Sequence, residues 1–116
     1  MASLTTDLHG AVTKVQVEVL LVLDESGQYV AYCPALELSS YGDTEEEAQQ
    51  AFEESLRFFA ADTVRRGTLD QLLLAFGWRV LKKPSAVYEP PRFPMELLNT
   101  PSRSRRVLTE ELLLPA

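Results

Sequence analysis

The sequence predicts an α+β fold in which one long helix packs on one face of a three- to four-stranded antiparallel sheet. Three observations predict it: an alternating apolar pattern around a turn in residues 15–33, a helical repeat of apolar residues in 44–66, and a glycine directly after that repeat. The chain has 116 residues, of which 46% are hydrophobic and 24% are charged. A chain of this length buries enough surface for one domain with a modest core.

The first predicted elements are two strands joined as a hairpin. Residues 15–23 alternate apolar and polar side chains in their first half and are all apolar in the second, which is typical of a strand whose far half is buried on both faces. The turn residues 24–27 lead into a returning strand at 29–33. Pro34 ends this strand because proline has no backbone N–H to donate, and a third short strand follows at 36–41.

A long helix follows the turn that Gly42 enables. Two N-caps fit its start: Thr44, paired with Glu47 in a capping box, or Asp43, paired with Glu46 one residue earlier. Apolar and small residues then recur every three or four positions and predict one inward stripe. The stripe comprises Ala48, Ala51, Phe52, Ser55, Leu56, Phe59 and Thr63.

Gly67 ends this helix by taking the left-handed conformation of a C-cap. Thr68 is expected to cap a second, short helix, and residues 78–81 are expected to form a fourth strand. Because prolines recur from Pro84 onward, we expect residues 82–116 to be a loop-like tail in which only 96–99 and 112–114 become ordered. The predicted organisation is therefore a flexible N-terminus (1–12), an α+β domain (13–81) and a Pro-rich tail (82–116) that docks on a neighbouring subunit.

Charge is unevenly distributed along the chain. The net charge is −6, from 11 basic and 17 acidic residues. Residues 1–78 carry 4 basic and 13 acidic side chains, which sum to −9, whereas residues 79–116 carry 7 basic and 4 acidic ones, which sum to +3. An acidic body repels the phosphate backbone and attracts basic proteins, so we expect no DNA binding by the body and a basic protein partner.

Few residues suggest catalysis, a cofactor or a metal centre. One Cys and one His do not make a zinc site of the usual type, although Cys33 and His9 together would form a thiol–imidazole pair. Packing of Cys33 in an apolar strand is the favoured interpretation. The acidic residues are mostly assigned to a helix start or to turns rather than to a metal cluster. We therefore expect no catalytic, cofactor-binding or metal-binding residue.

Two further groups of residues are candidates for nucleic-acid contacts. Tyr29, Tyr32 and Tyr41 lie on predicted strands without interleaved basic residues, so packing across the sheet is favoured. The basic cluster Arg103, Arg105 and Arg106 is short, and a solvated linker is favoured for it. No apolar run approaches the ~20 residues that cross a bilayer, and no signal peptide is recognisable at the start, so a cytoplasmic protein without a membrane span is expected.

Two stretches together resemble the HicB antitoxin family. The first is Tyr32-Cys33-Pro34-Ala35-Leu36-Glu37-Leu38, and the second is Tyr41-Gly42-Asp43-Thr44-Glu45-Glu46-Glu47-Ala48. The similarity continues less specifically through the helix and covers roughly residues 15–80. Its matching positions are structural: Pro34, Gly42, Asp43, Thr44 and Gly67. Since the usual C-terminal helix-turn-helix or ribbon-helix-helix is replaced by the Pro-rich tail, the chain resembles the stand-alone branch of that family.

The resemblance implies a degraded ribonuclease H-like fold, a homo-oligomer (dimer or tetramer), and neutralisation of a small basic ribonuclease toxin of the HicA type. The residues that would face the toxin are not given by the matching motif. One alternative is an orphan oligomeric module that binds a peptide or a small molecule and has no toxin partner. Another is a magnesium-dependent nuclease that uses the acidic residues.

Overall fold

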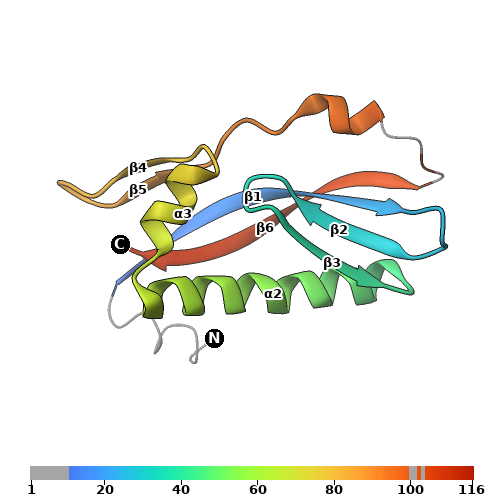
Figure 1. The fold of residues 1–116 in the computed structure, drawn as a ribbon, viewed down its shortest axis with the longest axis horizontal. Helices are drawn as coiled ribbons and strands as arrows, with labels where there is room; N and C mark the ends of the chain where they lie inside the picture. Colours follow the sequence, from blue (N-terminus) through green and yellow to red (C-terminus); the bar gives the residue numbers. More distant parts are fainter. Residues whose placement is uncertain (1–10, 100–101, 103) are drawn as a thin grey trace.

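A computed structural model describes residues 11–99, 102 and 104–116, and it confirms the predicted α+β class (Figure 1). Four antiparallel strands form the main sheet in the order β3-β2-β1-β6, and a second sheet pairs β4 with β5. The elements in chain order are β1 (Val12–Leu23), β2 (Tyr29–Cys33), β3 (Leu38–Gly42), α2 (Glu45–Arg66), α3 (Leu69–Ala75), β4 (Arg79–Leu81), β5 (Val87–Glu89), the 3₁₀ helix η1 (Met95–Asn99) and β6 (Arg105–Pro115).

The β1–β2 hairpin forms as the sequence predicts. Leu20 pairs with Tyr32 and Leu21 with Ala31, which fixes the register of the two strands. In the turn, the Asp24 carboxylate accepts hydrogen bonds from the Ser26 hydroxyl at 2.6 Å and from the Ser26 and Gln28 N–H groups at 2.9 and 3.0 Å. These bonds, led by the one from the Ser26 hydroxyl, lower the pKa of Asp24. Pro34 follows the last residue of β2, as expected.

The prediction of a loop-like tail is wrong for the end of the chain. Residues 105–115 form the long strand β6, which pairs with β1 of the same chain from Val12–Pro115 to Val22–Arg105. Leu112 and Leu114 are 1% and 0% exposed and belong to the main core. The α+β unit therefore does not end at residue 81, because residues 105–115 belong to its main sheet.

The fourth strand of the main sheet is also not the predicted one. Residues 79–81 do form a strand, β4, but it pairs with β5 in a separate small sheet. Tyr88 of β5 links this sheet to the main one, since its hydroxyl donates to the carbonyl oxygen of Pro115 at 2.9 Å. The small sheet thus sits beside the C-terminal end of β6 (Figure 1).

The core lies between α2 and one face of the main sheet. Strand alternation points Val17, Val19 and Leu21 of β1 towards the helix, where Phe52 and Leu56 meet them. Leu20 points to the opposite face and is only 4% exposed, whereas Val22 on that face is half-buried, so burial on both faces, predicted for the far half of this strand, is found only in part. The buried residues of α2 are Ala48, Phe52, Leu56, Ala60 and Thr63.

The start of α2 uses the first of the two predicted caps. Thr44 accepts a hydrogen bond from the Glu47 N–H at 3.1 Å, and the Glu47 carboxylate accepts one from the Asp43 N–H at 2.9 Å. Asp43 therefore contributes its backbone rather than a capping side chain. Gly42 is required for close approach: a Cβ there would lie 2.7 Å from the carbonyl carbon of Glu47.

The other predicted helix ends are partly right. Gly67 has φ of 71° and its N–H reaches the carbonyls of Thr63 and Val64, so it is the predicted left-handed C-cap. Thr68 precedes α3 as expected, but its side chain makes no capping hydrogen bond. The indole N–H of Trp78, just after α3, donates to the carbonyl oxygen of Ala35 at 2.7 Å and ties this region to the β2–β3 turn.

Candidate protein-interaction site

The outward side of α2 presents an exposed aromatic ring. Since the buried residues of α2 face the sheet, residues half a turn away face solvent. On this side Phe58 is 66% exposed, and Glu54 lies one turn before it. We call this surface the outer face of α2; it comprises Glu47, Gln50, Glu54, Phe58, Ala61 and Arg65.

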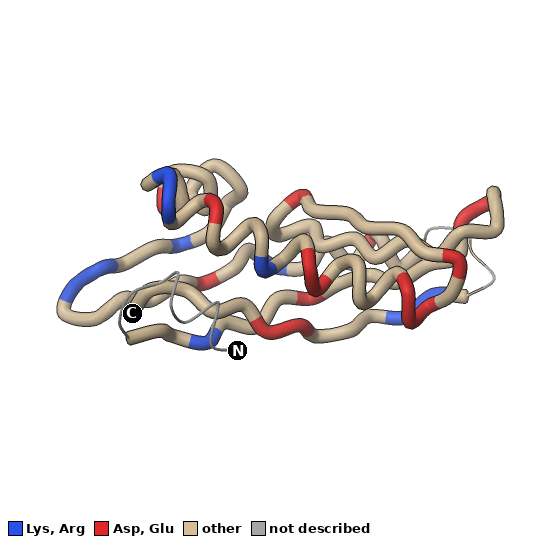
Figure 2. The backbone as a smooth tube through the Cα atoms, turned by 90° about the horizontal axis from the view of Figure 1, so that it is seen from below, with Lys and Arg blue, Asp and Glu red and all other residues tan. Residues whose placement is uncertain are grey.

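Carboxylates surround the first half of α2. Residues 43–54 contain six acidic residues and no Lys or Arg: Asp43, Glu45, Glu46, Glu47, Glu53 and Glu54. Figure 2 shows that many Asp and Glu residues lie towards the end where α2 begins and that Lys and Arg stand at the β4–β5 hairpin, with further basic positions elsewhere. The first turn of a helix favours negative charge, so Glu45, Glu46 and Glu47 stabilise the start of α2.

Two of these acids are already bound within the chain. Glu47 is held by the Asp43 N–H, and Glu45 is held by Arg106 of β6 at 2.8 Å. Glu46 and Glu54 are exposed, and no ion pair is found for either within the described part of the chain. The outer face of α2 therefore combines the exposed ring of Phe58 with the exposed carboxylate of Glu54, and Glu46 lies beside this face in the first turn.

A second group of acids lines a cleft between α2 and β6. The Gln49 side-chain amide donates to the Glu110 carboxylate at 3.1 Å, and Glu53 faces the same carboxylate. Burial raises the pKa of Glu110; the bond from Gln49 lowers it, and the neighbouring Glu53 raises it further. The cleft is about 210 Å³ and has an apolar floor that includes Leu56 and Leu112.

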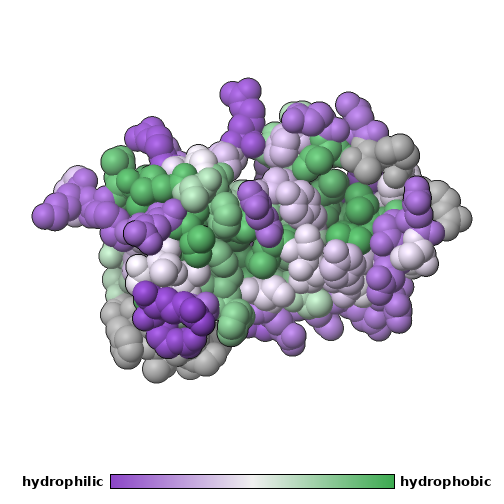
Figure 3. Space-filling view, viewed as in Figure 1, coloured by the Kyte–Doolittle hydropathy of each residue, from purple (hydrophilic) through white to green (hydrophobic). Residues whose placement is uncertain are grey.

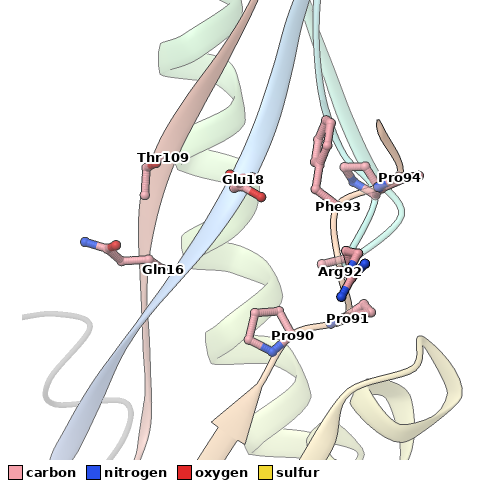
Figure 4. Close-up of a pocket in the computed structure, with 10 residues that line it drawn as sticks. Gln16, Glu18, Pro90, Pro91, Arg92, Phe93, Pro94 and Thr109 are labelled. Carbon is pink, nitrogen blue, oxygen red and sulfur yellow. The ribbon is translucent and has the colours of Figure 1, made fainter. Parts of the chain in front are cut away.

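The opposite face of the sheet carries a groove under the segment between β5 and η1 (Figure 4). Its volume is about 400 Å³. The strands contribute polar side chains from β1 and β6, and the covering segment contributes prolines, one aromatic ring and one cation. The lining residues are Gln16, Glu18, Pro34, Ala35, Pro90, Pro91, Arg92, Phe93, Pro94 and Thr109.

Another exposed apolar patch lies at the end of the molecule that carries α3 and the small sheet (Figure 3). Leu74, Leu81 and Val87 are 57%, 46% and 39% exposed. Its neighbours in sequence include Lys82 and Lys83, so it is bordered by positive charge. This patch suits a basic partner less well than the outer face of α2 does.

The thiol–imidazole pair is not assembled in the described part of the chain. Cys33 is 0% exposed in the core, and burial raises the pKa of its thiol to about 11. A buried, protonated thiol is a poor nucleophile. His9 lies outside the described residues. The packing interpretation of Cys33 is confirmed.

The other candidate residues from the sequence are the acidic residues, three tyrosines and three arginines. In the described residues, no group of three or more His, Cys, Asp and Glu side chains is arranged to hold a metal ion. Tyr41 is 55% exposed, whereas Tyr29 and Tyr32 are half-buried on β2. Arg105 and Arg106 begin β6 and are not part of a linker, and Arg103 lies outside the described residues.

Sequence reasoning missed Phe58 as a site residue, although a signal was present. The predicted inward stripe includes Phe59 and therefore places Phe58 a hundred degrees further round the helix. An aromatic ring outside the inward stripe of an amphipathic helix leaves apolar area available for a contact beyond the core.

No protein-family model, no curated protein and no solved structure matches this chain. Across the described residues, no helix has both the length and the apolar character needed to cross a membrane.

Proposed function

We propose that the chain is a cytoplasmic, non-catalytic protein-binding module of the HicB antitoxin-like kind, which binds a small basic protein through the outer face of α2. The observation that carries the proposal is Phe58, which is 66% exposed in the middle of a helix whose first half is acidic. The partner that the sequence resemblance implies is a small ribonuclease toxin.

Two physical effects support this surface. Aromatic residues at the centre of an interface supply much of its binding free energy, and Phe58 loses exposed apolar area only when a partner covers it. Exposed carboxylates such as Glu46 and Glu54 attract a basic protein from a distance and speed the encounter. Apolar centre and acidic surround are the composition expected of a surface for a positively charged protein.

Site-specific photocrosslinking in the native cell tests this proposal. A photoreactive phenylalanine analogue replaces Phe58, and in a matched control the same analogue replaces Leu74, which is 57% exposed on α3. We expect one defined adduct at position 58, with a small protein of basic isoelectric point, and no such adduct at position 74. Adducts with many proteins, with an acidic protein, or equally at both positions would contradict the proposal.

The groove between β5 and η1 favours the second candidate function, a module that binds a peptide or small molecule. Its volume of about 400 Å³ lies within the range of small-ligand sites, and Arg92 and Glu18 place opposite charges beside Phe93. A fragment screen followed by NMR tests it. Binding that shifts the signals of Gln16, Phe93 and Thr109 and is lost in Phe93→Ala would support this function, and no binding fragment would count against it.

A further inference from the structure

Strand β6 is an edge of the main sheet and has one described partner, β1. The phase of its hydrogen bonds is fixed at both ends: Leu23 N–H donates to Ser104 O, and Ala116 N–H donates to Ala11 O. In an antiparallel ladder, hydrogen-bonded positions alternate. The even-numbered residues of β6 therefore bond to β1, and the odd-numbered residues Val107, Thr109, Glu111 and Leu113 direct their N–H and C=O groups away from β1.

The side chains of the first part of β6 are also exposed to solvent. Arg105, Arg106, Thr109 and Glu111 are exposed, and Val107 is 37% exposed. Eleven residues of strand extend about 36 Å, so this edge offers a long row of backbone donors and acceptors. Such edges pair readily with another strand.

The sequence of this edge is complementary to itself. Residues 105–111 read Arg-Arg-Val-Leu-Thr-Glu-Glu, with two cations at one end and two anions at the other. If two copies pair antiparallel about Leu108, Arg105 lies opposite Glu111 of the other copy. In the same register, Arg106 lies opposite Glu110 of the other copy. The odd-numbered residues, whose backbone groups face outward, become the hydrogen-bonded pairs of the new ladder.

We propose that β6 is a homodimer interface, in which two copies of this chain pair their β6 strands antiparallel about a two-fold axis at Leu108. The two main sheets then form one continuous sheet with both α2 helices on the same face. A two-fold axis perpendicular to the sheet keeps each residue on its own face, as pairing of opposite residues requires. This inference does not depend on the proposed function, which concerns the outer face of α2.

Neighbouring registers are less favourable. A register centred on Thr109 places Glu110 opposite Leu108 and Glu111 opposite Val107, so no charge meets its opposite. A register centred on Glu110 places two carboxylates directly opposite each other, which is destabilising. The register at Leu108 alone pairs all four charged residues with the opposite sign, so the charges select it.

The acids in the α2–β6 cleft support the same arrangement. Glu53 faces Glu110, whose pKa is raised by burial and further by Glu53. Within the dimer, Arg106 of the second copy lies opposite Glu110 on the helix side of the sheet. There it adds a second cation to Arg57, which lines the cleft, and it also pairs with Glu45 of its own chain at 2.8 Å. The occupant of this edge is therefore a second copy rather than an unrelated strand, because the charges match the chain's own sequence in reverse.

Charge exchange between copies tests the register. Arg105→Glu places like charges opposite each other across both symmetric pairs, and so does Glu111→Arg. Sedimentation equilibrium is expected to show a dimer for the wild type and a dimer dissociation constant at least about tenfold larger for either variant. An equimolar mixture of the two variants restores opposite charges at every pair and is expected to dimerise like the wild type. Lys83→Glu, an equal charge change at an exposed loop position, leaves the dimer unchanged.

A backbone variant tests the strand pairing itself. Thr109→Pro removes an N–H that faces away from β1, so β1–β6 pairing persists while the dimer is expected to dissociate. Circular dichroism of each variant confirms that the chain folds. A wild type with the mass of one chain at about 100 μM, well above the range of specific dimers, would overturn the proposal. So would a dimer that neither the single charge variants nor Thr109→Pro weakens.

Discussion

Thr44 is the N-cap of α2. Thr68, which occupies the corresponding position before α3, offers a matched comparison. The Thr44 side chain caps α2 at 3.1 Å, whereas Thr68 precedes α3 without a side-chain capping bond. Thr44→Ala is expected to lower the free energy of unfolding by about 1 kcal/mol, and Thr68→Ala by much less. Asp43→Ala is also expected to have a small effect, since Asp43 contributes its backbone N–H. Urea denaturation measures all three, and equal losses at Thr44 and Thr68 would contradict the capping assignment.

Glu110 is expected to make stability depend on pH. Burial, with Glu53 nearby, raises its pKa above the ordinary 4.5, so the folded chain binds this proton more tightly than the unfolded chain. Stability from this group is therefore present at low pH and is lost as the pH rises through the raised pKa. Asp24 has the opposite sign because its pKa is lowered, and its contribution is lost as the pH falls.

Replacing Glu110 isolates its contribution. Glu110→Gln is expected to raise the free energy of unfolding at pH 7 relative to the wild type, and the difference should vanish as the pH falls below about 4.5. The comparison uses Thr109→Pro as background, so that the second copy is absent from the cleft. Glu96→Gln on η1 removes the same charge at an exposed position as a control. A stability difference that is independent of pH would show that Glu110 does not act through its proton.

At the level of elements, β6 is the part whose contribution is easiest to measure. Leu112 is 1% exposed on the helix side of the sheet, whereas Leu113 is half-buried on the other side. Leu112→Ala is expected to cost about 2–5 kcal/mol of stability because it leaves a cavity in the core, and Leu113→Ala clearly less. Thermal or chemical denaturation distinguishes them. Similar small losses for both would mean that β6 does not belong to the core.

Local patterns predicted the elements from β1 to α3 but not β6. Three of these patterns involve only a few neighbouring residues and can therefore be recognised in the sequence: the turn at residues 24–27, the capping box at Thr44 and the C-cap at Gly67. The pairing of Val12 with Pro115 joins opposite ends of the chain, and the prolines before β6 suggested a loop. One signal was present: residues 105–114 contain β-branched and leucine residues that can form a strand, and the long first strand has an edge that the hairpin leaves unpaired.

Less of the candidate site than of the fold could be predicted from the sequence. The acidic bias of residues 1–78 predicted the kind of partner, because charge sums need no three-dimensional information. The inward stripe of α2 already places Phe58 outside the core, but whether another element covers that side of the helix follows only when the other elements are in place. The Glu53–Glu110 contact likewise joins α2 to the strand that the sequence did not predict.

In the whole molecule, the proposed partner-binding surface and the proposed dimer interface lie on different elements and differ in charge. The outer face of α2 carries Phe58 after the acidic first half of the helix, the β6 edge is complementary to itself, and the far end with β4 and β5 is basic. Binding of a basic protein at α2 should therefore leave the dimer intact and should weaken as salt screens the charges. Sedimentation of the complex at low and high salt measures both effects, and loss of the dimer on partner binding would contradict this division.

Calorimetric titration measures whether Phe58 anchors a basic protein on the outer face of α2. The purified chain is titrated with the protein captured at position 58, and Phe58→Ala is compared with Leu74→Ala as the matched control. Binding is expected to be at least about tenfold weaker for Phe58→Ala and unchanged for Leu74→Ala. Equal affinity of the wild type and Phe58→Ala would contradict it.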